Sequence, residues 1–342
     1  MTTNIINEDC LESNKHIQPN SVDLFFTDPP YFTTGIYWDN QWKNNTEYYD
    51  WCKVWIQNMH TQLRDTGSAY VCCQWPHSGQ YQVMLQDAGF VIQNRITWKK
   101  DKGKGSNSNW KQMHEDIWFV TKSKNYTFNI DDVKEEKKVI APYRDEEGNP
   151  KDWWIDENGN KVRLTHPGNL WEKVSIPFWS SHEVKSYAKS KKSPDNIYEK
   201  HNTQKPKDLV AKCIIASSNP GDLVADYFGG SGTTAVACKE INREYILFEM
   251  NKTYCDIIKT RLQNEKPSEY TKKYKELSND LQNFDTSPLT ICKCIEVFQI
   301  IRKFFIKFIC KSYVLIPIST RYLVNMCQPQ QSLDLPFSEQ VC

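Results

Sequence analysis

The chain has 342 residues, of which 39% are apolar and 25% charged, with a formal net charge of +1. This length and apolar content suit one large domain with a smaller insert, or two modest domains. The near-neutral balance excludes a uniformly basic nucleic-acid binder, so any surface for DNA must be a local patch.

Twelve cysteines are scattered along the chain without the paired C-x-x-C spacing of a structural zinc site. The first residues lack the charged and then apolar segments of a secretion signal. We therefore expect reduced thiols, no bound metal and a cytoplasmic protein that does not enter a membrane.

Short apolar runs alternate with turn signals through residues 1–125, which predicts α/β structure. Residues 21–27 predict a buried strand that must end at Pro29 and Pro30, because two successive prolines cannot continue a ladder. Residues 48–63 have the apolar spacing of a helix. Beyond it we expect a strand, a short helix and another strand, over residues 68–73, 80–88 and 91–98.

A loop rich in lysine, glycine and serine follows that strand, over residues 99–111. Its composition fits a solvated surface loop and, equally, a loop that contacts DNA phosphates. In the second interpretation the lysines that contact the DNA, next to the strand end at Trp98, are Lys99, Lys100, Lys102 and Lys104.

Residues 126–200 are irregular, with glycine and proline turns and no long helical pattern. We interpret them as an inserted module of short strands and loops, whose polar and aromatic side chains could contact base edges. For most of its tryptophans we expect a small local core: Trp153, Trp154, Trp171 and Trp179.

Regular structure resumes at residue 204, with helices expected over 208–216, 233–240 and 252–262 and strands over 223–226 and 245–249. This order is typical of a parallel-sheet unit. After residue 285 the composition shifts to Ile, Phe and Cys, interrupted by basic residues that argue against a membrane span. Residues 286–342 are either a packing or dimerisation helix or an unselected extension.

A glycine-rich turn occupies the first crossover of that unit, at residues 226–234. Its glycines permit positive φ, and the following helix offers free N–H groups to an anion such as the carboxylate of a methionine moiety. It matches neither a Walker A loop nor G-x-G-x-x-G. Glu249 ends the next strand, where a carboxylate can accept hydrogen bonds from a ribose. A plain structural turn is the alternative.

Asp28, Pro29, Pro30 and Tyr31 follow a buried strand at the edge of the sheet where ligands of α/β proteins bind. An exocyclic base amine is a poor nucleophile, because its lone pair is delocalised into the ring. The Asp28 carboxylate and the Pro29 carbonyl could accept its two N–H groups, and the base could stack on Tyr31. The alternative is a strand-terminating turn with Tyr31 in the core.

Together these segments resemble the β class of DNA amino-methyltransferases, in which the catalytic tetrapeptide precedes the cofactor turn. The resemblance covers residues 4–265, through residues 7–10, 21–24, 27–31, 96–100, 114–116, 201–206, 226–234 and 248–251. It implies the Rossmann-like α/β fold of S-adenosylmethionine-dependent methyltransferases, with a mixed, mostly parallel sheet flanked by helices. The implied domains are a catalytic half (1–125), a target-recognition insert (126–200), a cofactor-binding half (201–285) and a C-terminal extension (286–342).

The resemblance also implies roles for single residues. Asp28, Pro29, Pro30 and Tyr31 match the catalytic residues, and Trp98 lies at the strand end where the family often places a residue beside the flipped target base. The residues implied to bind S-adenosylmethionine are Asp9, Thr203, Lys205, Pro206, Asp226, Phe228, Gly230, Gly232, Thr233, Thr234 and Glu249. Asn202 and Tyr227 replace prolines usual in the family, and we expect them to tune activity without abolishing it.

The implied reaction methylates N6 of adenine in double-stranded DNA, after the base is flipped out of the duplex. Cytosine-N4 methylation is the alternative within the class, although that branch usually carries Ser in place of Asp28. C5-cytosine chemistry needs a nucleophilic Cys, typically after Pro, and the chain has no Pro-Cys pair. Protein-glutamine methylation goes with Asn at the first position of the tetrapeptide. A catalytically inactive nucleic-acid-binding module is the alternative from another class.

The expected partner is double-stranded DNA, bound by a monomer or a homodimer. A cognate restriction endonuclease is a candidate companion. The segment from Gln330 to Phe337 resembles short peptides that dock on replication sliding clamps, so a clamp is a second candidate.

Overall fold

The computed structural model describes residues 4–33, 39–100, 107–140, 143–172, 204–264, 266–268, 270–272 and 274. Several expectations fall outside these residues: those for Lys102, Lys104, Trp179, Asn202, Thr203 and the whole of 286–342 with its clamp-like peptide. No helix within the described ranges is long and apolar enough to span a membrane.

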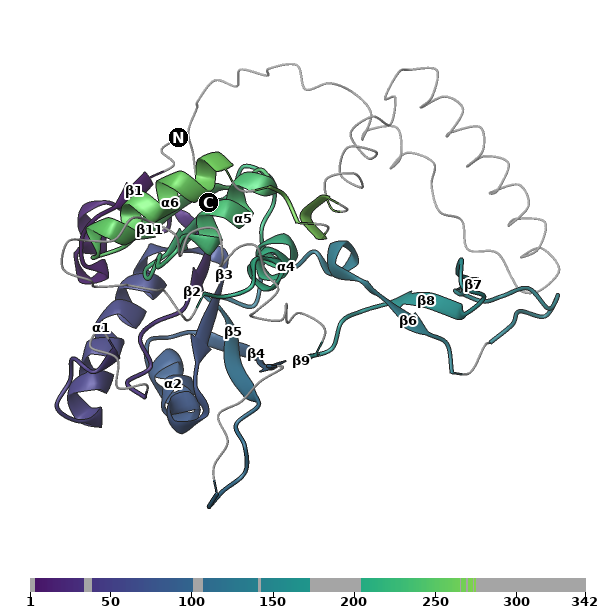
Figure 1. Ribbon diagram of the computed structural model, residues 1–342, viewed down its shortest axis with the longest axis horizontal. Helices are drawn as coiled ribbons and strands as arrows, with labels where there is room; N and C mark the ends of the chain where they lie inside the picture. The colour runs from purple at the N-terminus through teal and green to yellow at the C-terminus, as the bar shows by residue number, and fades with distance from the viewer. Residues whose placement is uncertain are drawn as a thin grey trace, which may run out of the picture. The chain divides into compact units, whose positions relative to one another are not determined.

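The described strands form a central eight-stranded sheet (Figure 1) in the order β1-β11-β10-β2-β3-β5-β4-β9. Neighbours from β1 to β3 are parallel, β5 is antiparallel to both of its neighbours, and the short β9 is parallel to β4. The mixed, mostly parallel sheet expected from the sequence is therefore confirmed. Its strands are β1 (Asn4–Ile6), β2 (Val22–Thr27), β3 (Leu63–Cys73), β4 (Val91–Lys99), β5 (His114–Thr121), β9 (Leu170–Trp171), β10 (Leu223–Asp226) and β11 (Glu244–Phe248).

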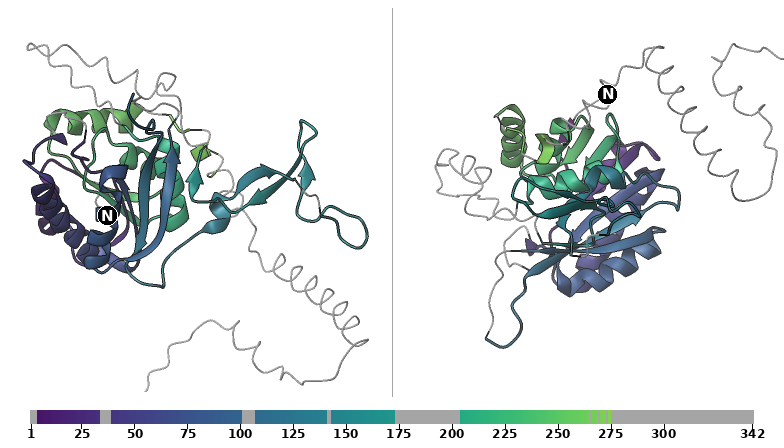
Figure 2. Two further views of the ribbon diagram at one scale, coloured as in Figure 1. Left: turned by 90° about the horizontal axis from the view of Figure 1, so that it is seen from below. Right: turned by 90° about the vertical axis from the view of Figure 1, so that its right-hand side faces the viewer.

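Helices cover both faces of this sheet (Figures 1 and 2), so its central strands are apolar on both sides. Leu24 and Phe26 of β2 lie in one core, with residues of α4, α5 and α6. Phe25, on the opposite face, lies in a second core with residues of α1 and α2. The helices are α1 (Asn45–Gln62), α2 (Trp75–Asp87), α4 (Lys207–Ser217), α5 (Thr233–Glu240) and α6 (Lys252–Asn264).

Two helix starts show what local sequence controls. The Asn44 side chain accepts a hydrogen bond from the Glu47 N–H at 3.0 Å and caps α1. α2 begins at Trp75, five residues before the expected start at 80, because Pro76 suits the first turn of a helix. Strand β5 was not predicted, since its first three residues, His114 to Asp116, are polar.

The insert contributes a second sheet of three antiparallel strands, in the order β6-β8-β7. Trp153 is buried there, and its indole N–H donates to the Tyr143 carbonyl at 2.7 Å. Trp171 is buried against the central sheet, whereas Trp154 is 42% exposed. A local core was expected for most of the tryptophans, and Trp154 is the described one that stays exposed. The elements are η3 (Ile130–Val133), β6 (Glu135–Lys138), β7 (Trp154–Ile155) and β8 (Lys161–Thr165).

Strand register brings the two predicted motifs to one edge of the central sheet. β10 pairs in parallel with β2, with Val224 opposite Leu24 and Ala225 opposite Phe25. Both chains leave the sheet just beyond these pairs, β2 into Asp28 and β10 into the turn after Asp226. Motifs about 200 residues apart in sequence therefore lie side by side at the carboxyl edge.

Candidate active site

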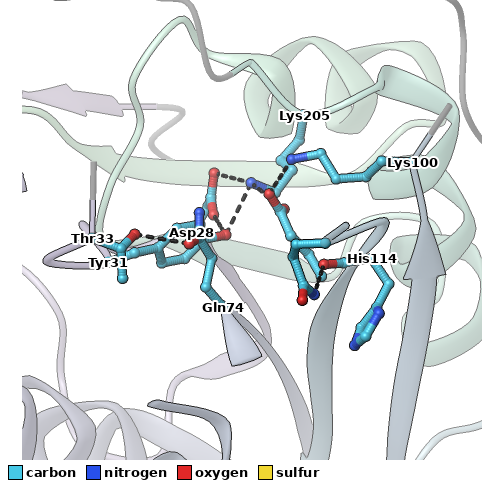
Figure 3. A network of polar contacts seen from close by, with 9 residues as sticks. Asp28, Tyr31, Thr33, Gln74, Lys100, His114 and Lys205 are labelled. Carbon is cyan, nitrogen blue, oxygen red and sulfur yellow. Dashed lines mark hydrogen bonds and ion pairs between the residues drawn. The ribbon is translucent and has the colours of Figure 1, made fainter. Parts of the chain in front are cut away.

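Asp28 is the centre of a buried polar network at the end of β2 (Figure 3). The Tyr31 hydroxyl donates to Asp28 Oδ1, and Lys205 Nζ donates to Asp28 Oδ2 at 2.6 Å and to the Tyr31 oxygen at 3.1 Å. Burial raises the pKa of Asp28, and the Lys205 ammonium counteracts this rise. Burial also raises the Tyr31 pKa well above its usual value, so its phenol remains a proton donor.

Asp39 holds the backbone that follows the tetrapeptide. Its Oδ1 accepts the N–H groups of Tyr31 at 2.5 Å and Phe32 at 2.8 Å, and its Oδ2 accepts that of Thr33 at 2.9 Å. The Tyr48 hydroxyl donates to the Pro30 carbonyl at 2.9 Å. Asp39 and Tyr48 were not predicted, because nothing in their own segments marks residues that act on a loop 6 to 18 positions away.

Glu115 enters the site from β5, the strand that runs against its neighbours. Its Oε1 accepts from Lys100, and its Oε2 lies 3.3 Å from Lys205 Nζ. Burial pushes the Glu115 pKa upward, but the charges of Lys205 and Lys100 outweigh burial and hold it below its usual value. Trp98, directly opposite Glu115 on β4, is 6% exposed. Glu115 lies in residues 114–116, one of the segments that resemble the family, but the sequence predicted no role for it.

Asp226 organises the glycine turn after β10. Its Oδ1 accepts the Phe228 N–H at 3.0 Å, and its Oδ2 accepts the Thr234 hydroxyl at 2.6 Å. Burial raises the pKa of Asp226 to about 7, although these two hydrogen bonds favour the ionised form. The side chain therefore closes the turn and changes its charge near neutral pH.

The glycines of this turn are required by its backbone. Gly230 and Gly232 have φ of 50° and 81°, and a Cβ on Gly232 would lie 2.7 Å from Ile258 Cγ2. The Gly230 N–H donates to Glu249 Oε2 and the Asn251 N–H donates to Glu249 Oε1, both at 2.8 Å. Glu249 thereby joins the turn to the end of β11, and its expected role as the ribose acceptor stays a prediction.

A buried arginine supports the same turn from α6. Arg261 is fully buried, and its Nη1 donates to the Ser231 carbonyl at 2.6 Å and to Thr233 Oγ1 at 3.3 Å. Arg261 was not predicted, because an arginine on an amphipathic helix is usually solvent-exposed. Asp9, in turn, caps the short helix η1 (Cys10–Lys15) by accepting the Leu11 N–H at 2.9 Å.

Comparisons with known proteins agree with this geometry. A family model for N6 and N4 methyltransferases, described as DNA methylase, matches residues 22–260. The chain belongs to this family. Membership confirms the resemblance drawn from the sequence and identifies a DNA methyltransferase that uses S-adenosylmethionine.

Two relatives and one solved structure illustrate the breadth of the family. The type II methyltransferase M.HpaI of Haemophilus parainfluenzae is 31% identical over 78% of this chain and 76% of its own. The DNA adenine methyltransferase YhdJ of Escherichia coli K12 is 33% identical, over 73% and 79%. The PvuII DNA methyltransferase structure, described as cytosine-N4-specific, has a TM-score of 0.55 at 19% identity, over 82% and 92%; this likeness shows the fold alone.

The cofactor half of this methyltransferase fits S-adenosylmethionine. Gly230 and Gly232 place no side chain at their two positions of the turn, and α5 begins there with the N–H groups of a helix terminus. Phe228 is fixed beside this turn by edge contacts with Trp55, at a ring-centroid separation of 5.5 Å. Of the residues expected to bind the cofactor, six form this turn and Glu249 contacts it, whereas the Lys205 ammonium lies at Asp28; the six are Asp226, Phe228, Gly230, Gly232, Thr233 and Thr234.

Tyr227 shows how this chain departs from the usual turn. Its hydroxyl donates to Gln62 Oε1 at 2.7 Å and accepts from the Ser13 hydroxyl at 3.3 Å. The ring is 2% exposed and packs edge-on against Phe25 and Phe248. A buried network therefore supplies the rigidity that a proline would otherwise provide.

The candidate DNA-contacting residues occupy different places. Trp98 is buried within the site, and Lys100 pairs with Glu115 beside it. Lys99 is half-exposed and pairs with Glu172 at 3.0 Å. Only Lys99, among these three, has the exposure expected of a phosphate contact at the surface.

Proposed function

We propose that this DNA methyltransferase methylates N6 of adenine in double-stranded DNA. The observation that carries the proposal is the Asp28 carboxylate, which lies at the carboxyl edge beside the Asp226 turn. Asp28 is an anionic acceptor, suited to an amine on which positive charge develops. The name of the relative YhdJ, a DNA adenine methyltransferase at 33% identity, favours the same base.

Each residue of the tetrapeptide has a distinct task in this proposal. S-adenosylmethionine supplies an activated methyl group on a sulfonium. Asp28 accepts one N–H of the target amine and the Pro29 carbonyl accepts the other, so the nitrogen lone pair is directed at the methyl carbon. As the new C–N bond forms, the electron pair of the broken S–C bond stays on sulfur. Asp28 then takes one amine proton and releases it to solvent.

Base flipping brings the target into this pocket, because the amine of a paired base is inaccessible inside the duplex. We propose that Tyr31 and Trp98 hold the flipped base between them, and that Lys99 contacts the phosphate backbone. We further propose residues 126–200 as the target-recognition region, flanked by a catalytic half (1–125) and a cofactor half (201–285). A companion restriction endonuclease fits the type II relatives.

Base identity can be tested directly. The chain is expressed in a host whose own DNA methyltransferases are deleted, and the DNA is digested to nucleosides for mass spectrometry. We expect N6-methyladenine to appear with the wild type and to be absent with Asp28→Ala. N4-methylcytosine in its place would overturn the adenine proposal while leaving the family assignment intact. Modified-base sequencing of the same DNA identifies the recognition site.

A further inference from the structure

Lys205 lies among the residues that the proposed function assigns to the target base. Its Nζ lies 2.6 Å from Asp28 Oδ2 and 3.3 Å from Glu115 Oε2. The same ammonium lies over the Tyr31 ring, 5.3 Å from its centroid, and over the Trp98 ring at 6.0 Å. The Lys205 ammonium thus lies among the carboxylates of Asp28 and Glu115 and the rings of Tyr31 and Trp98. Figure 3 shows its position beside Asp28.

This placement creates a conflict with methyl transfer. The target amine must donate a hydrogen bond to Asp28, and the base must lie beside Tyr31. Lys205 already contacts Asp28 and Tyr31. Removing the ammonium altogether would leave a buried carboxylate without a counter-ion, which is costly. The cation must therefore yield its contact with Asp28 and still stay in the pocket.

We propose that Lys205 is a placeholder cation, which neutralises Asp28 until the flipped base enters and is then held by Glu115. The proposal rests on the proposed methylation of a flipped base. Glu115 is in this scheme a positioning residue, since it acts on Lys205 and does not touch the base.

Glu115 has the properties that such a second holder requires. It is 5% exposed, and Lys100 already donates to its Oε1. Its Oε2 is buried and, within the described part of the chain, receives no hydrogen bond, although Lys205 Nζ is only 3.3 Å away. A small rotation at the end of the lysine side chain can shorten this contact to a hydrogen bond while freeing Asp28.

The total charge of the site does not change when Lys205 moves from Asp28 to Glu115. Asp28 and Glu115 carry two negative charges, and Lys205 and Lys100 carry two positive charges. A neutral base amine leaves this sum unchanged, so no net charge is buried or lost when the ammonium changes partner. The groups that face Asp28 from the surrounding elements are Tyr31, Cys72 of β3, Lys205, Glu115 of β5 and Asp226 of β10.

The first test removes the second holder with Glu115→Gln. A duplex with 2-aminopurine at the target adenine reports base insertion by fluorescence, and methylation of the unmodified duplex is followed in parallel. We expect base insertion to weaken about tenfold and kcat of the folded variant to fall by a similar factor, while cofactor affinity stays near wild type. Glu115→Asp should restore part of the loss, and Glu12→Gln, at an exposed position, should match the wild type. Unchanged fluorescence and kcat in Glu115→Gln would overturn the proposal.

The second test removes the placeholder with Lys205→Met. The base can then enter freely, so the 2-aminopurine signal should stay at or above the wild-type level. Without its counter-ion, Asp28 should have a higher pKa, so kcat should fall about tenfold at pH 6.5 and recover towards pH 9. Lys212→Met, which removes another buried lysine that pairs with the half-exposed Glu135, should leave the shape of the pH profile unchanged.

A loss in Lys205→Met that is equal at every pH, with reduced base insertion, would show a merely structural role for the lysine. Failure of the wild type to methylate DNA at all would instead refute the proposed function, so the two failures are distinguishable.

Discussion

The cofactor turn and the catalytic tetrapeptide lie at the same sheet edge but are held in different ways. The acidic residues that close the turn come from its own segment and the end of the next strand: Asp226 binds Phe228 and Thr234, and Glu249 binds Gly230. The tetrapeptide instead depends on distant groups, above all Lys205, which lies 177 positions away.

This difference separates two kinds of information. Local contacts leave a spacing pattern of glycine, threonine and acid that can be recognised in the sequence. Long-range contacts leave none, because any lysine or glutamate on another element could provide them. The four predictions below test whether the two regions also work independently.

The largest effect should come from Asp28→Ala. Loss of the carboxylate removes the acceptor for the target amine, so methyl transfer should fall about a thousandfold or more. Affinity for S-adenosylmethionine, measured by calorimetry, should stay within about twofold, because the cofactor turn does not need Asp28 for its backbone contacts. A parallel loss of cofactor affinity would show that the two regions are coupled. Asp87→Ala, at an exposed position in the last turn of α2, is the control.

Gly232→Ala should have the opposite effect to Asp28→Ala, weakening cofactor binding more than methyl transfer. The new Cβ would approach Ile258 to 2.7 Å in a backbone of positive φ, which costs about 1–3 kcal/mol of stability. Cofactor affinity should fall about thirtyfold as the turn shifts. Gly79→Ala provides a matched control, because a Cβ there meets nothing within 4 Å. The comparison fails if Gly232→Ala lowers kcat at saturating cofactor more than it lowers affinity.

Asp39→Asn should produce a smaller, purely catalytic defect. An amide is a weaker acceptor than a carboxylate for three backbone N–H groups, so the segment after Tyr31 should loosen and kcat should fall about tenfold. Rapid-quench kinetics with saturating cofactor measures this effect. Asp50→Asn, an exposed change on α1, should leave kcat unaltered. Equal rates for both variants would exclude the positioning role of Asp39.

The smallest effect concerns pH. Because the Asp226 pKa is raised to about 7, its carboxyl is mostly protonated below pH 6 and ionised above pH 8. The ionised form attracts the positively charged cofactor, so affinity should rise about fivefold between pH 6 and 8. The folded pKa exceeds the unfolded value, so this group lowers stability as pH rises from about 4 to 7 and adds no further change above it. Calorimetry across this range should show no such rise for Asp226→Asn.

Much of the fold could be predicted because its elements have strong local signals. The helix over 233–240 and the strand over 223–226 were placed without error, since a glycine turn separates them. Strand β5 was missed, because its polar start is explained only by Glu115 turning into the active site. The insert was recognised as irregular, but its pairing of Trp171 with Trp98 through β9 and β4 has no signature in the sequence.

The sequence by itself determined the family, the cofactor and the identity of Asp28, because these depend on short segments whose residue types carry the chemistry. Only the tertiary structure decided what surrounds Asp28. The parallel pairing of β2 with β10 brings it to the cofactor turn, and the reversed direction of β5 brings Glu115 to the same edge. The sequence placed Lys205 with the cofactor, whereas the structure places it between two buried carboxylates. Burial gives the physical reason for the position of Lys205, since a charged side chain removed from water needs partners of opposite charge, and these are the residues that the fold places beside it.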